Sequence, residues 1–131
     1  MSTTPGNSPA PERPCLHFVV LRHEGVADPH FDLLVEADPE QLLLAWRCPQ
    51  WPPQGGLMLH RLPDHRRIYL SYEGPVTGGR GHVTRVAGGE CRILEQSADR
   101  IRLALGNTTP PLDLTLMRQG QDRWLLSADA A

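Results

Sequence analysis

The chain contains no lysine, and all 13 of its basic residues are arginines. Together with 15 acidic residues they give a net charge of −2, which argues against a protein that holds nucleic acid by overall positive charge. A bias in nucleotide composition is the simpler explanation for the choice of arginine. A local stripe of arginines is still compatible with this balance, because the planar guanidinium group is well suited to phosphate. The position of each arginine therefore matters more than the net charge.

The chain also has few cysteines and no long apolar run. Its three cysteines, Cys15, Cys48 and Cys91, are odd in number and widely spaced, and no CxxC pair is present. This pattern excludes a cysteine-held zinc module and a secreted disulfide scaffold, and it predicts a reducing, cytoplasmic location. No apolar stretch approaches the roughly 20 residues that span a bilayer, and the start of the chain lacks the apolar core of a signal peptide. We therefore expect a soluble protein that is not exported and has no membrane partner.

Residues that turn the backbone are abundant, with 13 prolines and 12 glycines among 131 residues. Residues 1–14, rich in Pro, Ser and Thr, predict a disordered leader, and residues 15–131 predict one domain. Short apolar runs separated by turn residues fill this domain, and no segment has a convincing helical stripe. The predicted strands lie at 15–23, 30–38, 41–49, 57–63, 66–74, 81–89, 91–96, 100–106, 112–119 and 123–128.

This succession of about nine or ten short strands predicts an all-β protein, either an antiparallel barrel or a sandwich. Asp38-Pro39 is the turn signal between two of the strands, and the proline-rich and glycine-rich residues 48–56 predict a loop. A small barrel closes its own sheet edges. Its inner wall or its mouth, where polar residues line it, is then the natural place for a site.

The stretch HEGVADPHFDLLVE, residues 23–36, contains two histidines and an aspartate at the start of a predicted strand. Alternate residues of a strand share a face, so His30 and Asp32 would project together. His23 would return beside them if the two flanking strands form an antiparallel hairpin, which gives two imidazoles and a carboxylate for a divalent metal. On spacing alone, loop histidines and a surface carboxylate explain the pattern more often, because HxD is common by chance.

The stretch DHRRIYLSYEGP, residues 64–75, is the second group of interest. If it is a strand, His65, Arg67 and Tyr69 alternate onto one face and form a pocket for a phosphate or a leaving group. Ordinary strand aromatics and a solvated arginine face explain it as well. The glycines of the following GPVTGGRGHV permit backbone N–H groups to approach an anion, and a hairpin loop explains them equally. Trp46 and Cys48 favour a structural role.

The order of these segments resembles a known family. An apolar strand ending in RHE, then HFDLLVE, LLLAWRCP and DHRRIYLSYEGP followed by glycine, is similar to the 3′-phosphoesterase domain of bacterial DNA ligase D and its stand-alone relatives. The motifs span about residues 17–89, and the closing run from LMR onward fits the family's last strands. The resemblance implies a compact, closed antiparallel β-barrel with little helix and an Mn²⁺-dependent site, with another divalent transition metal as an option, that acts on DNA 3′ ends.

The resemblance also implies roles for individual residues. His23, His30 and Asp32 match the family's metal ligands, His65 matches the histidine that contacts the scissile phosphate, and Tyr69 matches the tyrosine that binds phosphate. The implied roles of His65 and Tyr69 are catalytic. One further match, Glu36, is the acid that closes the HxDxRxE strand and has a supporting role.

Two arginines of the family pattern are absent. Leu34 stands two places beyond the predicted metal-binding aspartate, Leu57 stands at the start of a later strand, and the family's EYGAG loop is shortened to GGRG. The loss of two arginine guanidinium groups from one anion site could remove a few kcal/mol of transition-state stabilisation. The candidates to replace them as phosphate ligands are Arg61, Arg67 and Arg80.

The function implied by the resemblance is healing of 3′ ends in DNA repair of the non-homologous end-joining type. The enzyme would remove a terminal 3′ ribonucleoside and then the 3′ phosphate from DNA or RNA-tailed DNA, so that a ligase or polymerase in trans can use the end. The alternative is a weak or inactive module that binds nucleic-acid ends on the same fold. A metal-dependent enzyme on a small-molecule phosphate is a third option. Arginines that reach the open face of the metal site would favour catalysis.

Overall fold

A computed structural model describes residues 15–106 and 112–130, with the side chain of Ala130 left out. The predicted leader, residues 1–14, lies outside the described residues. Within them no helix is long and apolar enough to cross a membrane. The described chain forms β1 (Leu16–Glu24), β2 (His30–Val35), β3 (Leu43–Cys48), β4 (Leu57–His65), the short 3₁₀ helix η2 (Arg67–Leu70), β5 (Gly74–Pro75), β6 (His82–Gln96), β7 (Arg100–Leu105), β8 (Leu112–Gly120) and β9 (Arg123–Ala130).

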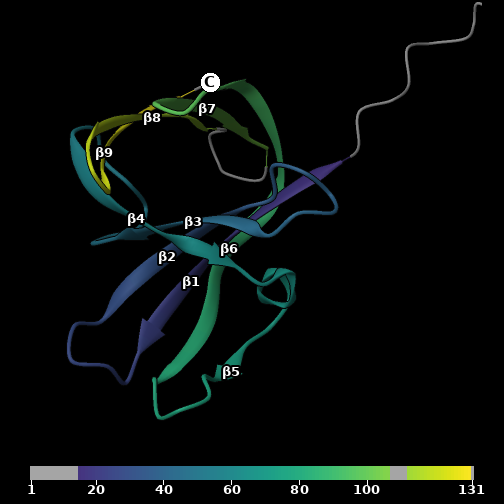
Figure 1. Cartoon of the computed structure of the whole chain (residues 1–131), viewed down its shortest axis with the longest axis vertical. Coiled ribbons are helices and arrows are strands. Elements are labelled where there is room, and N and C mark those ends of the chain that lie inside the picture. Colours follow the sequence, from purple (N-terminus) through teal and green to yellow (C-terminus); the bar gives the residue numbers. More distant parts are fainter. Residues whose placement is uncertain (1–14, 107–111, 131) are drawn as a thin grey trace, which may run out of the picture.

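The strands form a closed antiparallel barrel (Figure 1). Their order is β1-β2-β3-β4-β9-β8-β7-β6-β5, and pairing of β1 with β6 closes eight strands into a ring, with β5 as an extra strand on β6. The predicted all-β closed barrel with little helix is confirmed. Strand closure leaves few exposed backbone edges, which explains how a chain of short strands forms a stable sheet.

The turn and the loop predicted between the early strands are confirmed. Asp38 forms the turn between β2 and β3: its backbone carbonyl accepts from Gln41 N at 3.3 Å and its Oδ1 accepts from Glu40 N at 2.8 Å. Residues 49–56 connect β3 to β4 without forming a strand. This β1-β2-β3-β4 meander places consecutive strands side by side, as short connections require.

Two predicted strands differ from the structure. Residues 81–89 and 91–96 form one continuous strand, β6, whose first part pairs with β1 and whose last part pairs with β7. Residues 66–74 do not form a strand. Among the described residues no strand pairs with 66–71, so the backbone forms local bonds instead, with Tyr69 N donating to Arg66 O at 3.1 Å. The segment therefore turns as η2, and only Gly74–Pro75 pairs as β5.

Apolar side chains from every barrel strand fill the interior. In β2, Phe31 and Leu33 face this interior core, while His30, Asp32 and Leu34 alternate onto the other face. Trp46 and Trp124 pack edge to face inside it, with ring centroids 5.7 Å apart. The buried members of this core are Phe18, Val20, Leu33, Val35, Trp46, Cys48, Leu59, Cys91, Ile101, Leu103, Leu105, Leu114, Leu116, Trp124 and Leu126.

A second, smaller core lies on the opposite face of β1, β2 and β3. Its buried members are Val19, Leu21, Leu34, Leu43, Ala45 and Val83, and Tyr69, Leu70, Tyr72 and Val76 of the η2 to β5 region pack against it. The predicted metal ligands project from this same face. Apolar side chains fill the interior, so the predicted metal ligands lie on the outer face of the barrel and not on its inner wall.

Candidate metal centre and cleft

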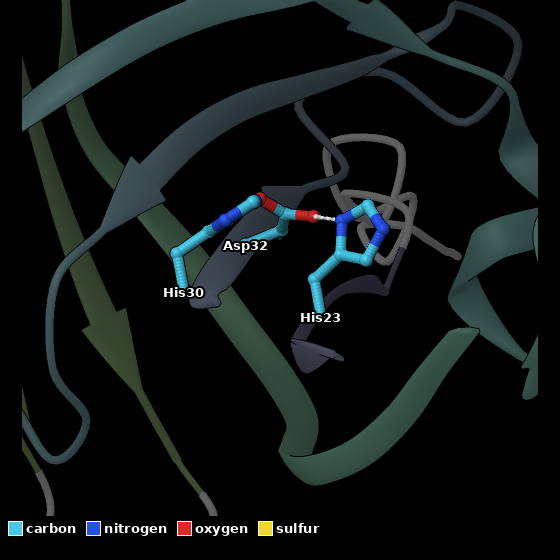
Figure 2. A group of neighbouring side chains, drawn as sticks. All are labelled: His23, His30 and Asp32. Carbon is cyan, nitrogen blue, oxygen red and sulfur yellow. Dashed lines mark ion pairs between the residues drawn. The ribbon is translucent and has the colours of Figure 1, made fainter. Parts of the chain in front are cut away.

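The β1–β2 hairpin brings the three predicted metal ligands together. The two strands are antiparallel, with His23 paired with His30 and Leu21 paired with Asp32, so the predicted return of His23 is confirmed. Figure 2 shows both imidazole rings flanking the carboxylate of Asp32. One ligating atom from each residue lies within 4.8 Å of the other two. The hairpin thus places two imidazoles and one carboxylate at a single point.

Backbone carbonyls determine which ring nitrogens face Asp32. His23 Nε2 lies 2.7 Å from the carbonyl oxygen of Arg80, and His30 Nδ1 lies 2.7 Å from that of Asp28. A carbonyl oxygen only accepts, so both of these ring nitrogens carry a hydrogen and donate it. In the neutral rings, His23 Nδ1 and His30 Nε2 then keep a lone pair. These atoms lie 3.5 Å from Asp32 Oδ2 and 3.2 Å from Asp32 Oδ1.

The carboxylate between the rings lacks compensation. Asp32 is only 4% exposed, and its Oδ1 has no hydrogen-bond donor among the described residues. A buried carboxylate without a donor is unfavourable, and two lone pairs directed at it add repulsion. A cation among the three atoms would remove both penalties. Two imidazole nitrogens and one carboxylate form a donor set that suits Mn, Fe or Zn, so the residues fit a divalent transition metal.

Arg47 on β3 supports His30 from outside the ligand set. Its guanidinium forms an ion pair with the Asp28 carboxylate and donates to the Asp28 carbonyl at 3.0 Å. The same carbonyl accepts from His30 Nδ1, so Arg47 fixes the loop that orients the ring. Such outer groups hold metal-binding imidazoles in one tautomer. Sequence reasoning missed this residue, because only the register of β2 with β3 brings it here.

Gly81 supports His23 in a comparable way from the β5–β6 loop. The hairpin-loop interpretation of GPVTGGRGHV is confirmed, since Gly74 pairs with Val83 across it. Gly81 has a φ of +74°, and a Cβ built on it would lie 2.0 Å from the backbone oxygen of Glu24. This close approach is open only to glycine. It seats the loop against the end of β1 and brings the Arg80 carbonyl to His23.

A cleft of about 480 Å³ opens beside this cluster. Five of the predicted site residues line it: His23, Asp32, Arg80 and the two catalytic candidates, His65 and Tyr69. The ring centroids of His65 and Tyr69 lie 5.9 Å apart. The lining residues are Leu21, His23, Asp32, Asp64, His65, Arg66, Tyr69, Val76, Thr77, Arg80 and Val83.

His65 and Tyr69 each bring to the cleft a polar side-chain atom that has no hydrogen-bond partner among the described residues. His65 Nδ1 donates to the carbonyl of Pro63 at 2.9 Å, which leaves Nε2 without a bond to the described residues. The Tyr69 hydroxyl likewise forms no hydrogen bond with the part of the chain that the structure describes. His65 ends β4, whereas the strand predicted for Tyr69 is wrong; both residues still line the cleft, because η2 turns Tyr69 back toward His65.

Two of the three predicted phosphate ligands point elsewhere. Arg61 donates to the carbonyl of Ala45 at 3.2 Å and to Asp64 Oδ1 at 2.7 Å, and its guanidinium carbon lies 5.1 Å from the centroid of the Trp46 ring. Arg67 donates to the carbonyl of Gln41 at 2.8 Å and to the buried carboxylate of Glu36. Neither arginine lines the cleft.

Glu36 is the buried partner of Arg67, and it lies outside the cleft. It is 5% exposed and accepts hydrogen bonds from Arg67 and from the backbone N–H of His17, the latter at 3.0 Å. Burial by itself would raise the pKa of the Glu36 carboxyl, but the donors from Arg67 and His17 outweigh it and the pKa is lowered. Its hydrogen bonds join the end of β2 to β1 and η2.

Leu34 and Leu57 stand where the family pattern has arginines, and they lie on different sides of the sheet. Leu34 is fully buried in the second core, on the face of β2 that carries Asp32. Leu57 pairs with Leu126 and packs against the interior core. Of the two positions, only position 34 lies on the face of β2 that carries Asp32, whereas position 57 faces the barrel interior.

The cleft also contains an arginine that sequence reasoning did not select. Arg66 is exposed, lines the cleft and has its guanidinium carbon 6.0 Å from the centroid of the Tyr69 ring. In a strand, Arg66 would face away from its neighbour His65, so strand alternation does not place it in the cleft. A turn prediction at residues 66–71 would have identified it.

Trp46 and Cys48 belong to the interior core, in agreement with their predicted structural role. Burial raises the pKa of the Cys48 thiol to about 12, and the negative charge of Asp32 adds to the effect. Such a thiol is neutral at physiological pH and is neither a nucleophile nor a ready metal ligand.

Comparison with known proteins adds no family assignment. No protein-family model matches the chain, and no curated protein matches it. The resemblance to the 3′-phosphoesterase domain thus stays a prediction that depends on the motifs themselves.

Proposed function

We propose that this protein is a divalent-metal-dependent phosphoesterase acting on the 3′ ends of DNA, with Mn²⁺ as the metal. One observation carries the proposal: His23 Nδ1, His30 Nε2 and a carboxylate oxygen of Asp32 converge without a donor among them, beside a cleft lined by His65 and Tyr69. Structural histidines usually have both ring nitrogens satisfied by ordinary partners. Here the two inner nitrogens meet a buried carboxylate.

The residues of the cleft match the needs of phosphate ester hydrolysis. A bound divalent ion would supply Lewis-acid withdrawal of charge from a phosphate oxygen. Hydrolysis forms one P–O bond to water and breaks the P–O bond to the leaving oxygen, which then needs a proton. His65 in its protonated form donates that proton from Nε2, since Nδ1 is held by the Pro63 carbonyl. The free Tyr69 hydroxyl donates to a phosphate oxygen.

The motif resemblance and the volume of the cleft support the choice of substrate. A cleft of about 480 Å³ is large enough for a phosphate and one nucleoside. The resemblance supplies the nucleic-acid 3′ end: removal of a terminal 3′ ribonucleoside and then of the 3′ phosphate, with a ligase or polymerase in trans using the resulting 3′-OH. The 2′-OH of a terminal ribonucleoside offers a second route for the first step.

Metal binding is the first test. We expect His30→Ala and Asp32→Ala to abolish Mn²⁺ binding in calorimetry, because each removes one of three ligating atoms. His60→Ala is the matched control, since His60 is an exposed histidine on β4 outside the cluster and should leave the affinity unchanged. Unchanged Mn²⁺ affinity in both His30→Ala and Asp32→Ala would refute the metal site.

Turnover is the second test. We expect the protein, in Mn²⁺, to release a nucleoside and then phosphate from a primer–template that ends in a single 3′ ribonucleotide. Asp32→Ala should be inactive and His60→Ala should match the unmodified protein. No product from a protein that binds Mn²⁺, even at high enzyme concentration, would exclude this activity.

A binding module for nucleic-acid ends is the second candidate function. The buried Leu34 on the cleft face favours it, together with the engagement of Arg61 and Arg67 outside the cleft. Only Arg80 of the three predicted phosphate ligands lines the cleft. This candidate predicts Mn²⁺-dependent binding of 3′-phosphorylated DNA without release of phosphate, which the primer–template assay separates from catalysis.

A further inference from the structure

We propose that Arg66 is a phosphate-binding residue of the cleft and recognises the terminal phosphate of the substrate. The inference rests on the proposed function for its substrate class and adds a residue that the motifs did not assign. Arg66 lines the cleft together with His65 and Tyr69, and it directly precedes η2.

The hydrogen bonds of the neighbouring arginines distinguish Arg66 from them. Arg80 donates from Nε to the carbonyl of Thr77 at 2.8 Å, within its own loop. Arg61 is bound to Asp64, and Arg67 is bound to Glu36. Among the described residues, Arg66 is the arginine of the cleft whose guanidinium has neither a hydrogen bond nor an ion pair. All five of its N–H donors are available to a ligand.

The surroundings of Arg66 favour an anion. Asp64 is the nearest acidic residue in sequence that lines the cleft, and its Oδ1 already accepts from Arg61 at 2.7 Å. Asp32 faces the two imidazoles of the candidate metal centre. Asp64 is therefore paired with Arg61, and Asp32 faces the two imidazoles. The positive charge of Arg66 has no carboxylate partner among the described residues. A phosphate matches its fork by two parallel hydrogen bonds.

The Arg66 guanidinium also lies close to the Tyr69 ring, so both side chains can contact the same phosphate. The guanidinium carbon lies 6.0 Å from the Tyr69 ring centroid, a distance at which a cation is attracted to the ring face. The Tyr69 ring in turn packs against the second core and lies 5.9 Å from the His65 ring. Arg66 thus shares the cleft with an imidazole nitrogen and a phenol that have no hydrogen-bond partner in the described part of the chain, and the three groups offer donors to one phosphate.

The test measures phosphate binding separately from turnover. Inorganic phosphate is titrated into Mn²⁺-loaded protein freed of excess metal, with Arg66→Ala, Arg66→Lys and Arg123→Ala as variants. Arg123 is also exposed and without a side-chain hydrogen bond to the described residues, but it lies on β9 and outside the cleft. We expect Arg66→Ala to bind phosphate about tenfold more weakly. The loss should be smaller for Arg66→Lys, which keeps the positive charge but cannot form two parallel hydrogen bonds.

The outcomes separate this inference from the proposed function. Mn²⁺ affinity equal to that of the unmodified protein in Arg66→Ala, with phosphate binding weakened and Arg123→Ala unaffected, supports Arg66 as a phosphate ligand. This result stands even if the primer–template assay yields no product, which would remove the proposed activity alone. Equal phosphate affinity of Arg66→Ala and unmodified protein overturns the inference, and so does an equal loss in Arg123→Ala.

Discussion

Replacing Gly81 with alanine tests how the β5–β6 loop holds the candidate metal centre. Gly81 and Gly79 belong to the same loop and have similar backbone angles, with φ of +74° and +69°. A Cβ on Gly79 would meet nothing within 4 Å, whereas one on Gly81 would lie 2.0 Å from the backbone oxygen of Glu24. Both substitutions therefore strain the backbone, but only Gly81→Ala adds a collision between two backbone segments.

The expected magnitudes follow from this difference. The left-handed conformation costs alanine about 1–2 kcal/mol, which is the whole penalty expected for Gly79→Ala. Gly81→Ala adds about 1–3 kcal/mol of overpacking. To relieve the contact, the loop must move from β1 by about 1 Å. The bond of 2.7 Å from His23 Nε2 to the Arg80 carbonyl would then be lost, and Mn²⁺ affinity should fall about 10–100-fold.

Urea unfolding and Mn²⁺ calorimetry on the two variants check the reasoning. Gly81→Ala should lose more unfolding free energy than Gly79→Ala and should also bind Mn²⁺ more weakly, while Gly79→Ala keeps its metal affinity. Equal losses of stability in both variants would show that the contact with Glu24 is not restrictive. Lost stability with unchanged Mn²⁺ affinity would show that the Arg80 carbonyl does not orient His23.

Two further predictions concern groups outside the cleft. Because the pKa of Glu36 is lowered below its ordinary value of 4.5, its ion pair stabilises the folded state above that value and loses its effect as pH falls through the folded pKa. Glu36→Gln should therefore lower the free energy of unfolding by about 1–3 kcal/mol at neutral pH, and the difference from the unmodified protein should shrink in acid. Denaturant titrations at several pH values check this, and a difference that stays constant with pH would contradict it. The exposed Cys15 should react with a thiol reagent in the native protein, whereas Cys48 and Cys91, whose pKa burial raises to about 12, should react only after unfolding. Rapid native labelling of all three thiols would refute their assigned burial.

The sequence predicted the fold class because alternation and turn residues act locally. The period of two in residues 30–35 placed His30 and Asp32 on one face, and the structure has them there. The same local rules failed at residues 66–74, where alternation suggested a strand. A strand needs a partner, and none of the described strands pairs with residues 66–71, so the backbone turned as η2. Pairing is a property of the whole sheet and is not visible in a short stretch.

The sequence by itself determined that His30 and Asp32 share a face, because strand alternation is local; the antiparallel pairing of β1 with β2 then brought His23 beside them. Only the tertiary structure decided which ring nitrogens face Asp32, because the acceptor for His23 comes from Arg80, 57 residues further along the chain. It also engaged Arg67 with Glu36 and left Arg66 in the cleft without a hydrogen bond or ion pair to the described residues. Side-chain partners depend on contacts between distant segments, so the pattern along the chain predicts the residues of a site better than their bonds.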